Sequence, residues 1–486
     1  MLHLPILRGG VGQGDAPYRS LNVEVLPHVV TGKPVAEVSQ ANPGLIARDL
    51  ARSAERRRVL EGLSGRELLA ICGRAAKLFV EGELPCGIDG ERQSPADYVR
   101  QLSSTTGMPE ALCRANMAKL EFVFAEMERV LAGLSRGLDP EALDRGFIEE
   151  DGRTVSYLAQ ADSLGIILPS NSPGVHSLWL PSIALKTPVT LKPGSREPWT
   201  PLRACQAFLA AGCPPEAVAF YPTSHSGGAE ILLGCGRSML FGDQHTVRPW
   251  KNDHRVQLHG PGWSKVLLAA DAFSAHDEGA ILDVVAESVA SNGGRSCVNA
   301  SGVWVDRAAA RGREFAAALA ERLAGIEARP LDHPQAALAG FGDRRVAEAM
   351  SRMVDQHLAT GGAEDLTARY RPVGDRLVEV DGLTYLLPTV VWCDDRNHPL
   401  AQTELLFPFV SVVEVDLQSD LDDLPPSLVV SALTDDANLR RRLLGHRSVE
   451  RLNLGSIPTS RVSWDQPHEG NLFGHLYRQR SFQASA

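Results

Sequence analysis

The chain has 486 residues, of which 44% are hydrophobic and 22% charged, and its formal net charge at pH 7 is -10. This length exceeds what one hydrophobic core usually supports, so two or three domains are expected. The acidic balance, with no cluster of basic residues interleaved with aromatic ones, argues against nucleic acid as a partner.

The N-terminal segment breaks into glycines after one short apolar patch, so it does not resemble a signal peptide. No uninterrupted apolar run approaches the roughly 20 residues that a bilayer-spanning helix needs. We therefore expect a cytoplasmic protein without a membrane span. The eight cysteines include no C-x-x-C pair, which argues against a disulfide framework and against a zinc site, and no metal is predicted.

The first third of the chain is predicted to be mainly helical. Within residues 118–131, apolar side chains recur at three- and four-residue steps, which places them on one buried face of a helix. These side chains are Leu120, Val123, Phe124, Met127 and Leu131.

From about residue 165, short apolar runs alternate with helical segments, which predicts parallel strands joined by right-handed crossovers. Thr200 followed by Pro201 is typical of a helix start with the hydroxyl as N-cap. A second alternating block follows, so two α/β domains with a ligand cleft between them are expected. Strand-like segments at 151–163 and 477–483 look isolated, and because such strands often pair with another subunit, we expect an oligomer.

Cys297 follows two glycines, Arg295 and a serine, between a predicted helix and a predicted strand. Small neighbours would let a carbonyl approach a thiolate, and Arg295 can add positive potential. A buried, inert cysteine fits the same pattern, because free cysteine is among the most buried residue types. The residues alone leave both interpretations open.

Three segments, in matching order and at similar intervals, resemble the aldehyde dehydrogenase superfamily over about residues 160–480. Asn292, Gly294 and Cys297 reproduce its N-x-G-Q-x-C segment, with Arg295 in place of the glutamine. Residues 168–194 resemble the strand, asparagine-proline turn, helix and strand that open its cofactor domain. Residues 403–415 resemble its E-x-F-G-P segment.

The resemblance implies a site and a fold. Cys297 would attack an aldehyde or thioester carbonyl, and the Asn171 amide and the Cys297 backbone N–H would stabilise the oxyanion, at on the order of 3 kcal/mol per donor. NAD or NADP would bind against Lys192, Ser195, Gly242 and Glu404.

The implied fold is α/β and aldehyde-dehydrogenase-like, with two doubly wound α/β domains and a small oligomerisation β element. We expect residues 1–145 and 162–262 to form a Rossmann-like NAD(P)-binding domain and residues 263–470 to form the catalytic domain. Residues 146–161 and 471–486 would supply oligomerisation strands in a homodimer or homotetramer.

His259 stands where acid-forming members of the superfamily carry the glutamate that activates water. A histidine can act as a base near neutral pH, and it can equally be a packing residue. The "HGPG", "LKT" and "MLFGDQHTV" segments resemble instead the coenzyme-A-acylating dehydrogenases and the fatty-acyl reductases. We therefore expect interconversion of an aldehyde and an acyl thioester, with coenzyme A as a possible cosubstrate. The alternatives are oxidation to the carboxylic acid with water as acyl acceptor, and a non-catalytic binding or scaffold protein.

Two further positions carry expectations. Ser195 stands where NAD-selective relatives often carry a glutamate, so NADP is permitted, with Arg196 as a partner for its 2′-phosphate; a plain turn fits equally well. His468 and Glu469 show no metal-ligand spacing and are expected in an exposed loop.

Overall fold

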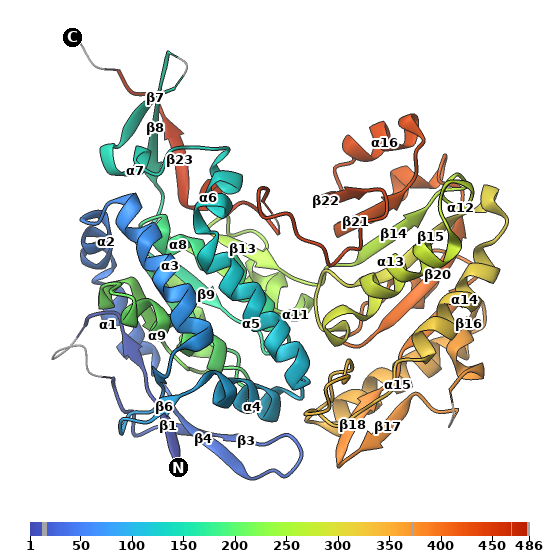
Figure 1. Ribbon diagram of the computed structural model, residues 1–486, viewed down its shortest axis with the longest axis horizontal. Helices are drawn as coiled ribbons and strands as arrows, with labels where there is room; N and C mark the ends of the chain where they lie inside the picture. The colour runs from blue at the N-terminus through green and yellow to red at the C-terminus, as the bar shows by residue number, and fades with distance from the viewer. Residues whose placement is uncertain (12–16, 151, 372–373, 468, 484–486) are drawn as a thin grey trace.

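The computed structural model describes residues 1–486 except 12–16, 151, 372–373, 468 and 484–486. Two large sheets each form the centre of one lobe (Figure 1). The six-stranded sheet has the order β13-β12-β9-β10-β11-β2, and the seven-stranded sheet has the order β16-β19-β20-β15-β14-β21-β22. The prediction of two α/β units is confirmed.

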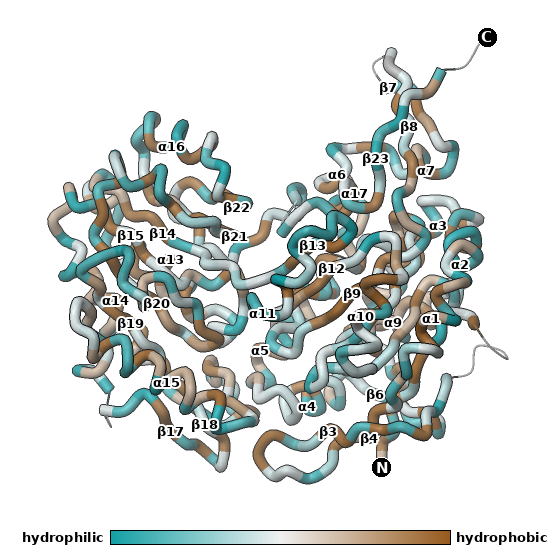
Figure 2. The backbone as a smooth tube through the Cα atoms, turned by 180° about the vertical axis from the view of Figure 1, so that it is seen from behind, coloured by the Kyte–Doolittle hydropathy of each residue, from teal (hydrophilic) through white to brown (hydrophobic). Residues whose placement is uncertain are grey.

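In the six-stranded sheet, β9 to β13 are parallel and β2 pairs antiparallel with β11. The strands are β2 (Leu7–Arg8), β9 (Leu164–Ile167), β10 (Val189–Lys192), β11 (Val218–Phe220), β12 (Arg237–Phe241) and β13 (Val256–His259). Figure 2 shows hydrophobic residues along the central strand β9. Because the strand order reverses between β9 and β12, ligands are expected at the carboxyl ends of these two strands.

Helices from the first half of the chain pack around this sheet. They are α1 (Pro43–Leu50), α2 (Ser53–Glu61), α3 (Gly65–Glu81), α4 (Pro95–Thr106), α5 (Glu110–Ala125), α6 (Met127–Ser135), α7 (Ala142–Arg145), η1 (Pro173–Leu178), α8 (Pro181–Ala184), α9 (Trp199–Ala210), η2 (Pro215–Ala217), α10 (His225–Gly234), α11 (Gln244–Val247) and η3 (Arg248–Trp250). The predicted apolar face of residues 118–131 is buried, although the helix breaks at Glu126 between α5 and α6.

One local prediction in this lobe is wrong. Helix α9 begins at Trp199, so Thr200 lies inside the first turn and is not the N-cap; its N–H donates to the Glu197 carboxylate at 2.8 Å, and its hydroxyl is hydrogen-bonded to the Tyr98 hydroxyl at 2.8 Å. The first third also contains strands that the helical pattern hid. They are β1 (Leu2–Leu4), β3 (Val23–Pro27) and β4 (Pro34–Ser39) in one sheet, and β5 (Leu84–Pro85) and β6 (Arg92–Gln93) in a hairpin.

The seven-stranded sheet is parallel except for β16, which pairs antiparallel with β19. Its strands are β14 (Ser264–Leu268), β15 (Ala300–Asp306), β16 (Ala363–Asp365), β19 (Thr389–Cys393), β20 (Phe409–Val415), β21 (Ser427–Leu433) and β22 (Val449–Leu454). The other elements of this lobe are α12 (Ala272–Ala275), α13 (Glu278–Ala290), η4 (Ser291–Gly294), η5 (Arg307–Ala309), α14 (Gly312–Ala324), α15 (Arg344–Leu358), η6 (Leu366–Arg369), β17 (Leu377–Val380), β18 (Leu383–Leu386), η7 (Pro399–Gln402), η8 (Asp420–Asp423) and α16 (Ala437–Leu444).

A small three-stranded sheet projects from the six-stranded lobe in both views (Figures 1 and 2). It has the order β23-β8-β7, with β7 (Phe147–Glu150), β8 (Arg153–Ala159) and, after α17 (Leu472–Leu476), β23 (Tyr477–Arg480). The two segments predicted to be isolated strands therefore pair within one chain; residues 151 and 484–486 of these segments lie outside the described residues.

Among the described residues, no helix combines the length and the apolar character needed to cross a bilayer.

Arg57 ties the small sheet to the six-stranded lobe, because its guanidinium donates to the Ala161 carbonyl at 2.8 Å and to the Tyr477 hydroxyl at 2.9 Å. Its exposed fraction is only 5%. We expect Arg57→Met to lower the free energy of unfolding by about 3 kcal/mol in urea titrations, because buried acceptors lose their donor. The exposed neighbour provides the control: Arg58→Met should change stability by less than about 0.5 kcal/mol. Equal stability of the two variants would contradict this role.

Candidate active site

A cleft of about 730 Å³ is lined by residues from both lobes. The carboxyl ends of β9 and β12 contribute to it, as the strand order requires. Of the seven residues predicted for the site, five line this cleft: Asn171, Gly242, His259, Cys297 and Glu404. The other two, Lys192 and Ser195, line a separate small hollow of about 30 Å³ beside β3.

The loop before Cys297 turns through three consecutive residues in left-handed backbone. The φ angles of Asn292, Gly293 and Gly294 are 53°, 67° and 71°. A Cβ on Gly294 would lie 2.4 Å from the Phe407 carbonyl carbon, so the loop backbone packs directly against the 407–408 peptide. Gly294 therefore permits a turn and a close backbone approach, as predicted, while the room for a substrate carbonyl beside the thiol stays a prediction.

Cys297 stands apart from the other seven cysteines, because they are buried while Cys297 is partly exposed. Its carbonyl accepts a hydrogen bond from the Ser264 hydroxyl at 2.9 Å. A Cβ on Gly262 would lie 1.9 Å from the same carbonyl oxygen, so only glycine allows the chain to pass this close. The "HGPG" segment thus fixes the backbone of Cys297.

Glu469 is the carboxylate in contact with the thiol. The Cys297 Sγ–H donates to Glu469 Oε2 at 3.7 Å. Burial and the negative charges of Glu469 and Glu404 raise the pKa of Cys297 well above its ordinary value. Burial also raises the pKa of Glu469, which makes this carboxylate a stronger base than a solvated glutamate. The site therefore holds a neutral thiol against a basic carboxylate.

Sequence reasoning placed Glu469 in an exposed loop, and this prediction is wrong. Only 11% of its side chain is exposed, and its backbone has a φ of 54°. His468, in the same prediction, lies outside the described residues. No periodicity or motif marks Glu469 in the sequence. It lies in the segment through which the chain returns from β22 to the small sheet.

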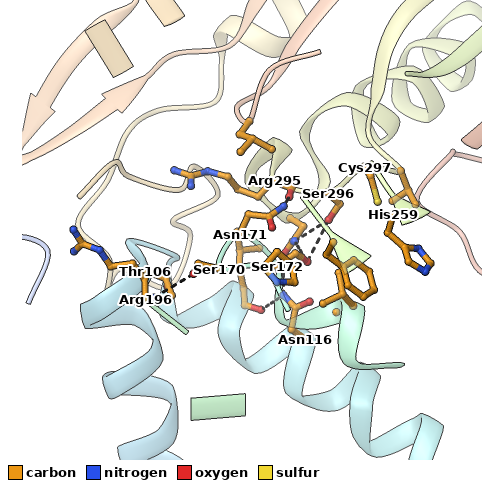
Figure 3. Close-up of a pocket in the computed structure, with 18 of the residues that line it drawn as sticks. Thr106, Asn116, Ser170, Asn171, Ser172, Arg196, His259, Arg295, Ser296 and Cys297 are labelled. Atoms are coloured by element: carbon orange, nitrogen blue, oxygen red, sulfur yellow. Dashed lines mark hydrogen bonds between the residues drawn. The ribbon is translucent and has the colours of Figure 1, made fainter. Parts of the chain in front are cut away.

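His259 lies beside Cys297 in Figure 3 but is a weak base. Its ring stacks on Phe241 with centroids 4.3 Å apart, and Nδ1 lies 3.9 Å from Glu469 Oε2. Burial lowers the pKa of His259 to about 3, so the imidazole is neutral at physiological pH and binds a proton poorly. The geometry therefore favours Glu469 over His259 as the base.

Asn171, in the loop after β9, reaches the loop before Cys297 (Figure 3). Its Nδ2 donates to the Arg295 carbonyl at 2.6 Å. No acceptor in the described part of the chain takes the Cys297 N–H. One predicted oxyanion donor, the Cys297 N–H, thus belongs to this loop, and the other, the Asn171 amide, contacts the loop directly.

Arg295 does not act on the thiol as predicted. Its Nη2 donates to the Gly340 carbonyl at 2.8 Å, and the guanidinium carbon lies 4.4 Å from the centroid of the Phe341 ring. Burial lowers the pKa of Arg295 to about 10. Because its side chain contacts residues 339–341, Arg295 anchors the loop before Cys297 to that segment.

The residues present fit a nicotinamide dinucleotide. The cleft has the volume of an ordinary ligand site. Glu404 lines it, and the carboxylate of Glu404 accepts hydrogen bonds from the backbone N–H groups of Gly262 and Trp263. Burial raises the pKa of Glu404 to about 7. In the small hollow, Lys192 Nζ donates to the Pro193 carbonyl at 3.4 Å and has no ion-pair partner among the described residues, so its other N–H groups are available to a sugar hydroxyl.

Two further predicted features can be placed. Gly242 follows β12 and donates to the His259 carbonyl at 3.1 Å, and a Cβ there would lie 2.6 Å from Thr246 Cβ. Arg196 lines the main cleft and not the hollow that contains Ser195. Among the described residues, no group of three His, Cys, Asp or Glu side chains could hold a metal ion.

Comparisons with known proteins agree with this geometry. The model of the aldehyde dehydrogenase family matches residues 96–424, more than half of the chain. No curated protein matches the sequence. Among solved structures, a putative aldehyde dehydrogenase from Burkholderia cenocepacia is similar at a TM-score of 0.77 with 15% identity, covering 99% of this chain and 97% of that one.

Two other solved structures have comparable folds. An NAD-dependent benzaldehyde dehydrogenase from Corynebacterium glutamicum has a TM-score of 0.76 at 16% identity, covering 98% of this chain and 97% of that one. An indole-3-acetaldehyde dehydrogenase mutant from P. syringae in complex with NAD+ has a TM-score of 0.77 at 17% identity, covering 99% of this chain and 96% of that one. At these identities the likeness is one of fold.

The contact between Cys297 and Glu469 predicts an unusual effect of Glu469→Gln on thiol reactivity. Because the Glu469 charge raises the pKa of Cys297, removing it should move the midpoint of the pH profile for iodoacetamide alkylation to lower pH. Alkylation at neutral pH should therefore become faster. Glu321→Gln, at an exposed position on α14, should leave the midpoint in place. A midpoint in Glu469→Gln that is unchanged or higher would contradict the assignment.

Proposed function

This chain belongs to the aldehyde dehydrogenase family, and we propose that it oxidises an aldehyde to the carboxylic acid with NAD or NADP, through a thioester on Cys297. The observation that carries the proposal is the Glu469 carboxylate 3.7 Å from the Cys297 thiol in a cleft that Asn171 also lines. A thiol, a base and an oxyanion donor at one point are what covalent acyl chemistry requires.

In the first half of the proposed reaction, Glu469 takes the proton of the Cys297 thiol, and the thiolate adds to the aldehyde carbon. The Asn171 amide and the Cys297 N–H donate to the oxygen that becomes negative. NAD(P)+, when bound, accepts the hydride that leaves this carbon. The product of this half is a thioester on Cys297, and Glu469 releases its proton to solvent.

In the second half, Glu469 takes a proton from water as the oxygen of that water adds to the thioester carbonyl. The carbon–sulfur bond then breaks, the electron pair returns to Cys297, and Glu469 passes its proton back to the thiolate. The carboxylic acid product loses its own proton to solvent. Summed over both halves, aldehyde, NAD(P)+ and water give carboxylate, NAD(P)H and two protons, and the site returns to a neutral thiol beside a carboxylate.

This proposal revises the product expected from the sequence. The sequence favoured an acyl thioester as product, because the glutamate of the family's water-activating position is replaced by His259. Glu469, which comes from a different part of the chain, supports water as the acyl acceptor. Transfer of the acyl group to coenzyme A is the second candidate, and the neutral His259, a weak base at the usual position, favours it.

We propose NAD as the first cofactor to test, since matched structures are named as NAD-dependent or as NAD+ complexes. NADP remains an alternative because Ser195 carries no charge that would repel a 2′-phosphate. We also propose that residues 1–145 with 162–262 form the NAD(P)-binding domain, that residues 263–470 form the catalytic domain, and that residues 146–161 with 471–486 supply oligomerisation strands. The chain would assemble as a homodimer or homotetramer through the small sheet.

The choice between water and coenzyme A is tested by following NAD(P)H with a panel of aldehydes, with and without coenzyme A, while the product is analysed. We expect free carboxylate at full rate without coenzyme A. Glu469→Gln should lower kcat by about 100- to 10,000-fold, the range of general base catalysis. Glu321→Gln, at the exposed position on α14, serves as the control. A requirement for coenzyme A, with acyl-coenzyme A as product, would establish the second candidate instead.

The role of Asn171 gives a separate expectation. Asn171→Ala should lower kcat/KM about 100-fold, because it removes one oxyanion donor worth about 3 kcal/mol. Alkylation of Cys297 by iodoacetamide forms no oxyanion and should change less than about threefold. A parallel loss in both measurements would mean that Asn171 only holds the loop in place.

A further inference from the structure

One lysine, on α5, lines the cleft from the six-stranded lobe. Leu112, Ala115, Asn116 and Lys119 recur at three- and four-residue steps along α5 and all line the cleft. The Lys119 ammonium lies near Gly174, since a Cβ there would be 3.3 Å from Nζ. It also lies 5.8 Å from the centroid of the Trp464 ring.

Lys119 has no carboxylate partner. No Asp or Glu oxygen of the described residues lies within 4.0 Å of its Nζ, although Glu469 lines the same cleft. Glu469 Oε2 is instead directed at the Cys297 thiol at 3.7 Å. A partly buried ammonium in a cleft, with no carboxylate within ion-pair distance among the described residues, can pair with an anion that enters the cleft, and this points to an anionic group on the ligand.

A second cation lies behind this wall of the cleft. Arg451, on β22, donates from Nη2 to the Thr459 carbonyl, but its Nε and Nη1 are buried without an acceptor among the described residues. Ser460, next to Thr459, lines the cleft. Cys297 and Glu469 both interact electrostatically with Lys119 and with Arg451, so the two cations belong to the same part of the site.

The lining around Lys119 also limits the shape of the ligand. Leu112, Ala115, Val175 and Val462 line the cleft and provide apolar contact, which suits a short carbon chain. The carboxylates of Glu404 and Glu469 in the same cleft would oppose a dianion. A singly charged carboxylate therefore fits better than a phosphate.

We propose that the substrate is an aldehyde with a carboxylate at its other end, and that Lys119 binds this carboxylate while Arg451 adds positive potential from behind. This inference rests on the proposed function, because it assigns the substrate of the same site. Its product is a dicarboxylate. Lys119 is then a specificity-determining residue.

The test compares ω-carboxylated aldehydes of several chain lengths with the methyl esters of the same compounds. In the wild type, we expect kcat/KM to be about 10- to 100-fold higher for the acid than for its ester. Lys119→Met should reduce this ratio by about the same factor, Lys119→Arg should retain most of it, and Lys77→Met, at an exposed position, should not change it. A wild-type ratio near one, or a ratio that Lys119→Met leaves unchanged, would overturn the inference. The second result would mean that Lys119 acts only on the thiol.

A binding measurement separates failure of this inference from failure of the proposed function. Glutarate should slow the alkylation of Cys297 by iodoacetamide in the wild type, and much less in Lys119→Met; neutral glutaramide should protect neither protein. If no aldehyde is turned over but glutarate protects, the anion site stands and the proposed oxidation is wrong. If aldehydes are oxidised but glutarate and glutaramide behave alike, the oxidation stands and the anion site is wrong.

Discussion

The close approach of the "HGPG" segment to the Cys297 carbonyl is the constraint on which the site depends. Gly262 passes where any Cβ would meet the carbonyl oxygen, and Ser264 donates to that oxygen. Glu404 holds the same segment through the Gly262 and Trp263 N–H groups. The thiol direction is therefore set by backbone contacts at the connection between the two large sheets, and the loop before it must turn through left-handed residues to meet them.

Charge is distributed around this fixed thiol in a way that separates two tasks. Glu404 lines the cleft from the seven-stranded lobe and Lys119 lines it from α5 of the six-stranded lobe, and both charges act on the thiol. Glu469 contacts the sulfur directly and shares with it a buried environment in which the neutral thiol is favoured. In such a pair, proton transfer between the two groups, rather than a resting thiolate, prepares the nucleophile.

The fold could be predicted because alternating apolar runs marked the strands of both sheets, whereas Cys297 was singled out by the resemblance of residues 292–297 to the family's N-x-G-Q-x-C segment and not by a local pattern. Helix starts were less certain: α9 begins one residue before Thr200, whose hydroxyl is hydrogen-bonded to the distant Tyr98 and does not cap the helix. Glu469 could not be predicted, since it reaches the thiol across 172 residues of chain through a loop without periodicity. Resemblance directed attention to position 259, where His259 stacks on Phe241.

The central claim is that Glu469 supplies the base that removes the acyl group from Cys297. Rapid quenching of Glu469→Gln during turnover, followed by mass analysis of the peptide that contains Cys297, tests it directly. The account predicts that this variant carries the acyl group on Cys297 in a large fraction of molecules, whereas the wild type carries little. A variant with unmodified Cys297 that releases carboxylate at the wild-type rate would contradict it.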